Sequence, residues 1–541
     1  MYRFMLSALA LACATAPVMA SAAESMQPYA DSGNAWFVGG EMAIKAKTQA
    51  FEAIRPGPGS AKNVILFVGD GMGISTITAA RILDGQNKGL SGEENELSFG
   101  RFPFSGLSKT YNVDQQTPDS AGTMSAMMTG VKTDAGIISI DENVQRGDCR
   151  SGQGHEVFTA LELAEVAGMS TGVVTTARLT HATPAATYAH AAERDWEDVS
   201  DMPAEAVAAG CPDIADQLVN FQARLQQRSG VAVNGIEVAM GGGRRHFLPA
   251  DAAFNSPDAV STVEGDRSDG RNLINEWQQT YPDGNYVYGL DGFNAIDPAK
   301  TTHLLGLFNE SHMRFEADRP NDKSGEPTLA EMTSKAIDVL DNNPQGYFLM
   351  VEAGRIDHAH HAGNAFNALS EAIELSDAVA AAVAATSSDD TLIIVTADHS
   401  HVFTMAGYPK RGNPILGKVV EVGKDSPELM DDGLPYTTLG YMNGPGFHDL
   451  GDETDAEVVY DLPVTPGRQD LSKVDTQSPG FHQEALHPRE SETHGGEDVG
   501  IFATGPGGHL VTGVNEQNVI FHIMNYAAGL ESKAAAARDD Q

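Results

Sequence analysis

Four short apolar runs of this chain end abruptly at residues with oxygen-bearing or imidazole side chains. They span residues 63–70, 172–176, 347–352 and 391–399. Nearly continuous apolar runs of this length are typical of buried parallel strands. Because the active-site crevice of an open α/β sheet lies at the carboxyl ends of its strands, the polar residues that end these runs are predicted to meet at one shared site for several metal ions.

Strand-like runs alternate with helix-like runs over residues 61–415. This alternation predicts an α/β fold with a mostly parallel central sheet and helices on both faces. Residues 416–490 are rich in Gly, Pro and Asp and are predicted to form a small insertion, after which residues 491–541 complete the core. Residues 23–60 are interpreted as an N-terminal arm that contains a helix. A length of 541 residues fits one large domain with insertions as well as two domains.

The N-terminus has the layout of a secretory signal. Arg3 precedes an apolar stretch and then small residues that end at Ala22, so residues 1–22 are predicted to be a signal peptide. A buried core helix fits less well because the segment has no polar face, and a lipoprotein signal at Cys13 stays open. No later run reaches about eighteen apolar residues, which predicts no membrane span. The mature protein is expected in the periplasm or in the medium.

Two cysteines, Cys149 and Cys211, remain after the predicted signal peptide. In an oxidising compartment two cysteines can pair. Closing a loop of that length stabilises a protein by roughly 4 kcal/mol in the chain-entropy model. Two buried thiols are the alternative that the sequence leaves open.

Acidic residues outnumber basic residues 74 to 35, which gives a formal net charge of -39. A nucleic-acid partner is therefore not expected, because binding a phosphate backbone requires a basic surface. So large a negative charge is tolerable in a salty, screened environment. A soluble anionic secreted protein is the simpler alternative.

The segment 355–361 contains the first metal-ligand pattern. Asp357 and His361 are four residues apart, so they share one face of a helix, and a carboxylate with an imidazole forms half of a zinc site. A solvated histidine-rich turn is the alternative. Asp398 and His399 are a stronger signal, because both directly follow a strand and the turn there can aim them into one crevice.

Ligand chemistry divides the candidates into three sets. Nitrogen with carboxylate suits zinc, whereas oxygen alone suits magnesium. The predicted sets are Asp357, His361 and His494 for one zinc ion; Asp70, Asp398 and His399 for a second; and Asp70, Thr183 and Glu352 for magnesium. Asp70 then bridges two metal ions, and the glycines on both sides of it leave room for this. A histidine such as His494, taken alone, is more often structural.

Ser120 is the candidate nucleophile. The residues after it have a helical pattern, so Ser120 is predicted at a helix N-terminus, where backbone N–H groups favour an anion. An ordinary N-cap is the alternative for a serine in this position. The metal ligands favour the nucleophile, because a bound zinc ion can deprotonate the hydroxyl.

Six motifs in chain order carry a resemblance to a known family. They are VGDGMG at 68–73, TPDSA at 117–121, THATP at 180–184, EAGRIDHAHH at 352–361, TADHSH at 396–401 and ETHGGED at 492–498. From about residue 60 to the C-terminal helix the chain resembles the alkaline phosphatases. The resemblance implies hydrolysis of small phosphate monoesters at two zinc ions and one magnesium ion, with Ser120 becoming phosphorylated and Arg194 clamping the phosphate. It also places four residues beside the metal ligands: Asp119, His181, His358 and His401.

The subtype resembles the animal enzymes. His181 and His358 stand where some bacterial members carry Asp and Lys, and Cys149 and Cys211 match a cysteine pair of the animal type. The insertion at 416–490 resembles the animal-type crown, which implies a homodimer. Calcium as a fourth metal ion stays open, and Asn309 argues against it because the animal type carries Glu at that position.

Two alternatives to a phosphate-monoester hydrolase stay open. A phosphodiesterase or a sulfatase of the wider superfamily is one alternative, but a sulfatase needs a Cys/Ser-x-Pro-x-Arg segment that is not found at Ser120. A non-catalytic periplasmic protein that binds metal or phosphate is the other, and it would not need both Ser120 and Arg194.

Overall fold

The computed structural model of the protein describes residues 59–539. The predicted signal peptide, 1–22, lies outside the described residues. The predicted arm, 23–60, also lies outside them except for its last two positions.

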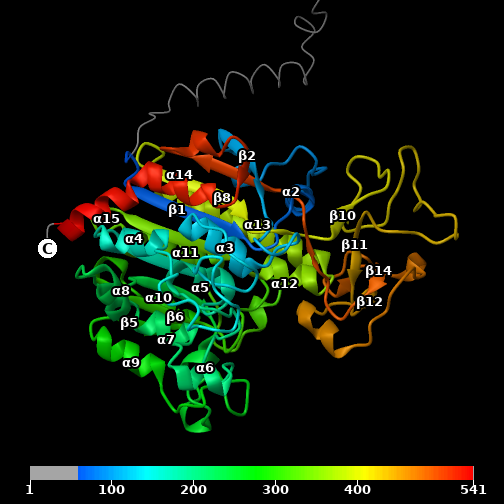
Figure 1. The fold of residues 1–541 in the computed structure, drawn as a ribbon. Coiled ribbons are helices and arrows are strands. Elements are labelled where there is room, and N and C mark those ends of the chain that lie inside the picture. The colour runs from blue at the N-terminus through cyan, green and yellow to red at the C-terminus, as the bar shows by residue number, and fades with distance from the viewer. Residues whose placement is uncertain (1–58, 540–541) are drawn as a thin grey trace, which may run out of the picture. The chain divides into compact units, whose positions relative to one another are not determined.

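A ten-stranded sheet forms the centre of the described part of the chain (Figure 1). Its strands lie in the order β17 (Gly513–Glu516), β2 (Phe104–Lys109), β16 (Val499–Thr504), β8 (Thr391–Ala397), β1 (Asn63–Gly69), β7 (Tyr347–Ala353), β3 (Ser170–Arg178), β4 (Val238–Gly242), β6 (Leu304–Leu307) and β5 (Asn285–Val287). Every neighbouring pair is parallel except the two that β16 forms with β8 and β2. The predicted α/β fold with a mostly parallel sheet is confirmed.

Helices cover both faces of this sheet, which explains why its central strands are apolar throughout. Successive side chains of β1 point to opposite faces. Val64, Leu66 and Val68 belong to one core cluster, with residues of α3 (Ser120–Thr129), α4 (Ala160–Val166), α5 (Ala182–Tyr188), α14 (Val519–Ala528) and α15 (Leu530–Asp539). Ile65 and Phe67 belong to the other, with residues of α2 (Ile74–Asn87), α11 (Leu329–Leu340) and α13 (Ala365–Ala385).

Shorter helices lie in the connections between β3 and β6. They are α6 (Ala204–Ala209), α7 (Ile214–Val219), α8 (Phe221–Ser229), α9 (Leu273–Thr280) and α10 (Leu290–Ala295). Helix α12 (Arg355–His361) begins after a single residue that follows β7. The short connection fixes α12 at the carboxyl end of the sheet.

The register of the central strands brings their ends together. Gly69 of β1 pairs with Ala353 of β7 on one side and with Ala397 of β8 on the other. Three fully buried carboxylates therefore meet at one edge of the sheet, on Asp70, Glu352 and Asp398.

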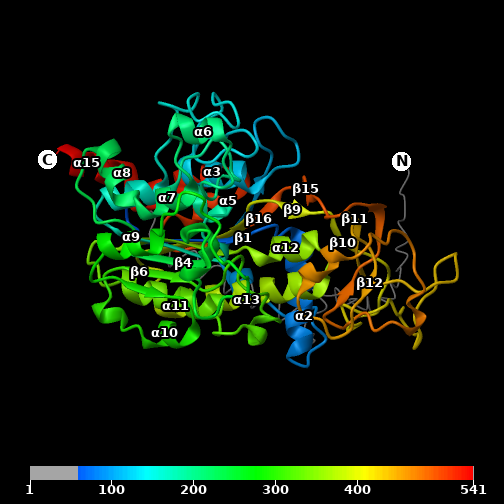
Figure 2. The same cartoon turned by 90° about the horizontal axis from the view of Figure 1, so that it is seen from below.

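Smaller sheets lie beside the main one, to the right in Figure 1, and Figure 2 shows the same separation from below. Strands β10 (Phe403–Met405), β11 (Leu439–Gly444) and β14 (Ala485–Pro488) form one of them, and β12 (His448–Asp449) pairs with β13 (Phe481–His482). Strand β9 (Ser400–His401) pairs with β15 (His494–Gly495). The predicted insertion, 416–490, contains β11 to β14, whereas β10 precedes it. The limits of the insertion stay a prediction.

Cys149 and Cys211 form a disulfide, with their Cα atoms 6.0 Å apart. Pairing, rather than two buried thiols, is therefore what the structure shows. Both cysteines pack against a small apolar cluster that includes Trp196 and Met202. Within residues 59–539 no helix is long and apolar enough to cross a membrane.

Candidate active site

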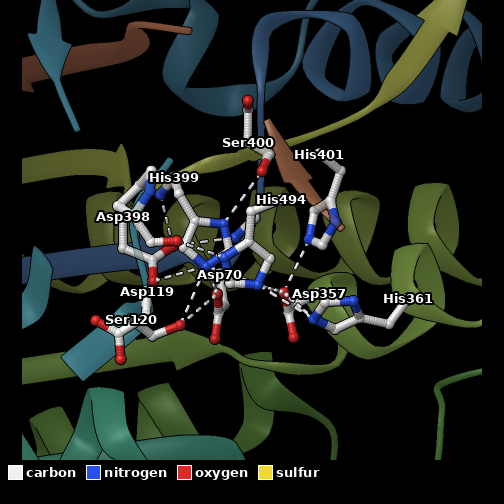
Figure 3. A network of polar contacts seen from close by, with 12 residues as sticks. Asp70, Asp119, Ser120, Asp357, His361, Asp398, His399, Ser400, His401 and His494 are labelled. Atoms are coloured by element: carbon white, nitrogen blue, oxygen red, sulfur yellow. Dashed lines mark hydrogen bonds and ion pairs between the residues drawn. The ribbon is translucent and has the colours of Figure 1, made fainter. Parts of the chain in front are cut away.

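Strand ends and short helices bring the predicted metal ligands to one edge of the sheet, and Figure 3 shows six of them: Asp70, Asp357, His361, Asp398, His399 and His494. The ligands are Asp70 after β1, Thr183 in α5, Glu352 in β7, Asp357 and His361 in α12, Asp398 and His399 after β8, and His494 in β15. The helical spacing predicted for Asp357 and His361 is present, since α12 contains both.

Asp357, His361 and His494 have the spacing of a zinc site. The Nε2 atoms of His361 and His494 lie 3.1 Å apart, and each lies 3.4 Å from Asp357 Oδ1. Ligand atoms bound 2.0–2.1 Å from a tetrahedral zinc ion are about 3.3 Å from one another. The three atoms therefore fit one zinc ion without rearrangement.

Backbone carbonyls hold the imidazole rings in one orientation. Each ring donates from Nδ1 to a carbonyl oxygen: that of Glu492 at 2.7 Å for His361, that of Pro118 at 2.7 Å for His494, and that of Ser400 at 3.2 Å for His399. Because a carbonyl oxygen only accepts, Nδ1 carries the hydrogen and the lone pair is on Nε2. This is the arrangement that orients histidines toward a metal ion.

Asp70, Asp398 and His399 form the second set. His399 Nε2 lies 3.2 Å from Asp70 Oδ1 and 3.4 Å from Asp398 Oδ2. The hydroxyl of Ser120 lies 3.1 Å from the same His399 Nε2 and 3.5 Å from Asp70 Oδ1. The candidate nucleophile is therefore within hydrogen-bonding distance of the second set.

Oxygen atoms of the second and third sets are buried without a hydrogen-bond partner in the described part of the chain. They are Asp70 Oδ2, Thr183 Oγ1, Glu352 Oε1 and Asp398 Oδ2. Unpartnered buried oxygens are rare in folded proteins, and a divalent cation would satisfy all four. Thr183 lies beside Glu352, whose other oxygen accepts a hydrogen bond from Thr175. The oxygen-only third set has the chemistry that magnesium prefers.

Burial and mutual repulsion disfavour negative charge on this cluster when no cation balances it. Burial and then the charge of Asp398 raise the pKa of Asp70 well above its usual range. Burial raises the pKa of Glu352 to about 8. For Asp357 burial acts in the same direction, but the interaction with His361 and a hydrogen bond from His401 outweigh it and lower the pKa. The carboxylates of the site therefore fit divalent cations.

Helix α3 begins at Ser120, and Asp119 is its N-cap. The side chain of Asp119 accepts a hydrogen bond from Gly122 N–H at 3.2 Å. The alternative in which Ser120 is an ordinary N-cap is therefore wrong. The Ser120 hydroxyl lies at the positive end of the helix dipole, where developing negative charge is stabilised.

Arg194 reaches the site from the loop after α5. It donates from Nη1 to Asp119 Oδ2 at 3.1 Å and from Nη2 to His181 Nε2 at 3.2 Å. His181 Nδ1 therefore carries the hydrogen, and it is buried without a partner in residues 59–539. The rings of His181 and His358 are 5.5 Å apart between centroids, so both predicted neighbours lie together beside the third set.

Three more side chains lie beside the site, and the sequence singled out only His401 among them. His401, a predicted neighbour, lies 2.8 Å from Asp357 Oδ1 through Nε2, while its Nδ1 lies 2.6 Å from Glu492 Oε2. Glu492 belongs to the sixth motif, but its spacing assigned it no function. His312 packs on His358, with 4.0 Å between ring centroids. It comes from a loop without any motif, so no local signal could have found it.

The fold and the site together define an α/β metalloenzyme with a serine at a helix start among its metal ligands. A family model described as alkaline phosphatase matches residues 61–530. The tissue-nonspecific isozyme of alkaline phosphatase from Homo sapiens is 43% identical over 472 residues, which cover 86% of this chain and 84% of that protein. The alkaline phosphatase of Gadus morhua is 43% identical over 470 residues, which cover 86% and 92%.

Solved structures agree on the fold. The alkaline phosphatase of Thermus thermophilus superposes with a TM-score of 0.59 at 24% identity, over 90% of this chain and 98% of that one. The enzyme from the Antarctic bacterium TAB5 gives a TM-score of 0.55 at 22% identity, over 87% and 99%. The chain belongs to the alkaline phosphatase family. It is a metal-binding hydrolase of phosphate monoesters.

Proposed function

We propose that the protein releases inorganic phosphate from phosphate monoesters through a phosphoserine on Ser120. The observation that carries this proposal is the position of Ser120 Oγ, 3.1 Å from His399 Nε2 at the start of α3. A serine needed only for folding would not have to lie among buried carboxylates and imidazoles.

The proposed metals are two zinc ions and one magnesium ion. Asp357, His361 and His494 would hold one zinc ion, Asp70, Asp398 and His399 the other, and Asp70, Thr183 and Glu352 the magnesium ion. When bound, such cations supply positive charge that favours the ionised serine and the departing alkoxide.

In the proposed reaction Arg194 binds the phosphate group and Ser120 accepts it. The Arg194 guanidinium donates to Asp119, the residue before Ser120, and a guanidinium binds two oxygens of one phosphate side by side. Ser120 Oγ attacks phosphorus, the bond from phosphorus to the alcohol oxygen breaks, and the alcohol leaves with a proton. A water molecule then attacks the phosphoserine, which breaks the Oγ–P bond, releases inorganic phosphate and restores Ser120.

Hydrolysis of an aryl phosphate by the wild type, Ser120→Ala and Ser125→Ala tests this proposal. Ser125 lies in the same helix, but its hydroxyl donates to the carbonyl of Ile137 at 3.1 Å. We expect Ser120→Ala to lose at least about a thousandfold in kcat while it keeps its metal content, and Ser125→Ala to keep most activity. Equal activity of Ser120→Ala and the wild type would overturn the proposal.

We also propose that two copies of the chain form a homodimer. Met442 of β11 and Leu486 of β14 are 54% and 67% exposed. They lie side by side, because Tyr441 pairs with Ala485 and Asn443 with His487. Apolar side chains gathered on one exposed sheet face favour a protein partner. Sedimentation of the wild type and of Met442→Glu/Leu486→Glu tests this, with a monomeric variant and a dimeric wild type as the expected result.

The proposed location is the periplasm or the medium. The predicted signal peptide supports it, and so does the Cys149–Cys211 disulfide, since disulfides persist in oxidising compartments. The strong excess of acidic residues is the reason for expecting no nucleic-acid partner.

A further inference from the structure

Behind Arg194 lies a buried polar cluster that the proposed chemistry does not use. Its centre is Glu197, three residues after Arg194, with a side chain that is only 10% exposed. Burying a carboxylate is costly unless it is paired and hydrogen-bonded. The number and origin of its partners therefore indicate what this carboxylate holds in place.

Three side chains from separate segments converge on the Glu197 carboxylate. Arg178, at the end of β3, donates from Nε to Oε2 at 2.8 Å and from Nη2 to Oε1 at 2.5 Å. Thr180 donates from its hydroxyl to Oε2 at 2.5 Å. His246, in the 3-10 helix η2 (Arg244–Phe247), lies 3.3 Å from Oε2 through Nε2, while its Nδ1 lies 2.6 Å from Asp198 Oδ2. One carboxylate thus connects β3, the turn before α5 and η2.

Arg178 links Glu197 to the histidine rings beside the proposed metal ligands. Its backbone N–H donates to His312 Nδ1 at 3.2 Å, and its guanidinium contacts His312 Nε2. The ring of His312 packs on those of His358 and His181, at 4.0 and 5.4 Å between centroids. The contacts form a closed loop, because His181 accepts a hydrogen bond from Arg194 and Arg194 is joined to Glu197 by three peptide bonds.

The charges in this loop depend on Glu197. Burial lowers the pKa of His312, the ring that the Arg178 guanidinium contacts, well below the usual range, so this ring is neutral. Burial alone would raise the pKa of Glu197, but the charges of Arg178 and His246 lower it, so this carboxylate is ionised. Glu197 therefore supplies the negative charge that balances Arg178. Without Glu197, the Arg178 guanidinium would face the uncharged ring of His312.

We propose that Glu197 is a positioning residue that fixes the orientation of His181 and, through the hydrogen bond between His181 and Arg194, that of Arg194, and thereby sets the affinity of the site for phosphate. Thr180 directly precedes His181, so its hydrogen bond to Glu197 fixes the start of the segment that carries His181. Glu197 touches no predicted metal ligand and no reacting atom. Glu197 acts through Arg194, the side chain that the proposed function assigns to the phosphate oxygens.

Competitive inhibition by inorganic phosphate measures this effect directly. We expect Glu197→Gln to bind phosphate about 5- to 20-fold more weakly, because the arginine clamp loses its fixed orientation. The expected change in kcat is smaller, about threefold or less, and the zinc content stays unchanged. The matched control is Glu162→Gln, which removes a buried carboxylate paired with His190 and Arg228 and touches neither Arg194 nor the three rings. The control is expected to keep the phosphate affinity of the wild type.

A double-mutant cycle with Arg194→Ala separates positioning from general damage. Because the proposed function gives Arg194 its role in binding phosphate, the positioning by Glu197 rests on that proposal. If Arg194→Ala leaves phosphate affinity unchanged, the proposed role of Arg194 fails, and the role of Glu197 fails with it. If Arg194→Ala weakens binding and Glu197→Gln weakens it further by the same factor in that background, only the positioning by Glu197 is overturned. The expected result is that Glu197→Gln has no further effect once Arg194 is Ala.

Two further variants keep the test decisive if Glu197→Gln does not fold. Thr180→Val removes one hydrogen bond to Glu197 without changing any charge, and it is expected to weaken phosphate binding about two- to fivefold. Glu197→Asp keeps the charge, and it is expected to recover part of the affinity. Wild-type phosphate affinity in Thr180→Val, together with no difference between Glu197→Asp and the wild type, would contradict the positioning role.

Discussion

The Nε2 atoms of His361 and His494 lie 3.1 Å apart, although neither ring carries a hydrogen there. Both rings donate from Nδ1 to backbone carbonyls, so two lone pairs face each other beside the carboxylate of Asp357. Such an arrangement is unfavourable unless a cation lies between the two nitrogens. The backbone therefore prepares this site for a metal ion.

Removing the metals is therefore expected to destabilise the protein as well as to inactivate it. A cation present at 100 times its dissociation constant stabilises by about 2.7 kcal/mol, so three sites filled to that degree give roughly 8 kcal/mol. We expect a chelator to lower the melting temperature by about 5–15 °C and zinc with magnesium to restore it. The control is the same chelator already saturated with zinc. An unchanged melting temperature in protein shown to be metal-free by elemental analysis would contradict the assignment of these residues as ligands.

Glu371, a buried carboxyl of α13, makes stability depend on pH. Burial raises its pKa to about 8, and its carboxyl accepts a hydrogen bond from Glu316 N–H at 2.5 Å. Between about pH 4.5 and pH 8 the unfolded chain ionises this group while the folded protein keeps it protonated. The stability it contributes is therefore complete below about pH 4.5 and is lost as the pH rises toward 8.

The variant Glu371→Gln removes this titration. We expect it to gain stability relative to the wild type as the pH rises, by at most about 1.4 kcal/mol per pH unit within that window. Denaturant unfolding at pH 5 and pH 8 measures the difference, and Glu205→Gln makes the same change on an exposed surface. A difference between Glu371→Gln and the wild type that is the same at both pH values would show that Glu371 does not titrate in this way.

The disulfide is expected to contribute to stability through the loop that it closes. Cys149 and Cys211 are 62 positions apart, and closing such a loop stabilises by about 4 kcal/mol in the chain-entropy model. Cys149→Ser/Cys211→Ser should therefore unfold at lower denaturant concentration. Trp196 packs in the same apolar cluster two residues after Arg194, so phosphate binding should also weaken. Recovery of two freely alkylated thiols from the secreted wild type would show that the disulfide does not form.

His181 and His358 are expected to set the balance between phosphate binding and turnover. His358→Lys alone would bury a cation beside Arg355, which contacts His358 Nδ1 at 2.9 Å. An unpaired buried charge costs about 3–5 kcal/mol, and an Asp at 181 would recover part of it. The double variant His181→Asp/His358→Lys should hold magnesium and product phosphate more tightly, with lower turnover if release limits the rate. Phosphate inhibition measured on both proteins at one pH and salt concentration tests this, and equal affinities would refute it.

The central part of the fold could be predicted because its signals are local. The run 63–69 is apolar on both faces, and the structure covers both faces with helices. Asp70 and Asp398 directly follow strands, so a parallel register is enough to bring them together. The spacing of Asp357 and His361 predicts one helix face, and α12 provides it.

Other parts of the site depend on contacts that no spacing encodes. The hydrogen bonds that orient the rings of His361 and His494 end on the backbone oxygens of Glu492 and Pro118. Any residue type supplies such an oxygen, so the sequence does not reveal these contacts. Glu197 and Arg178 meet only because a loop folds back onto the end of β3. Ser120 and Asp119 are both good caps in sequence, and the hydrogen bond to Gly122 N–H decides between them.

Trapping the covalent intermediate tests the central claim most directly. Enzyme mixed with labelled inorganic phosphate and quenched at low pH is expected to carry label on the peptide that contains Ser120, at close to one phosphate per active site. Ser120→Ala should carry none, whereas Ser125→Ala should be labelled like the wild type. Label on a histidine peptide, or undiminished labelling of Ser120→Ala, would contradict a mechanism in which Ser120 accepts the phosphoryl group.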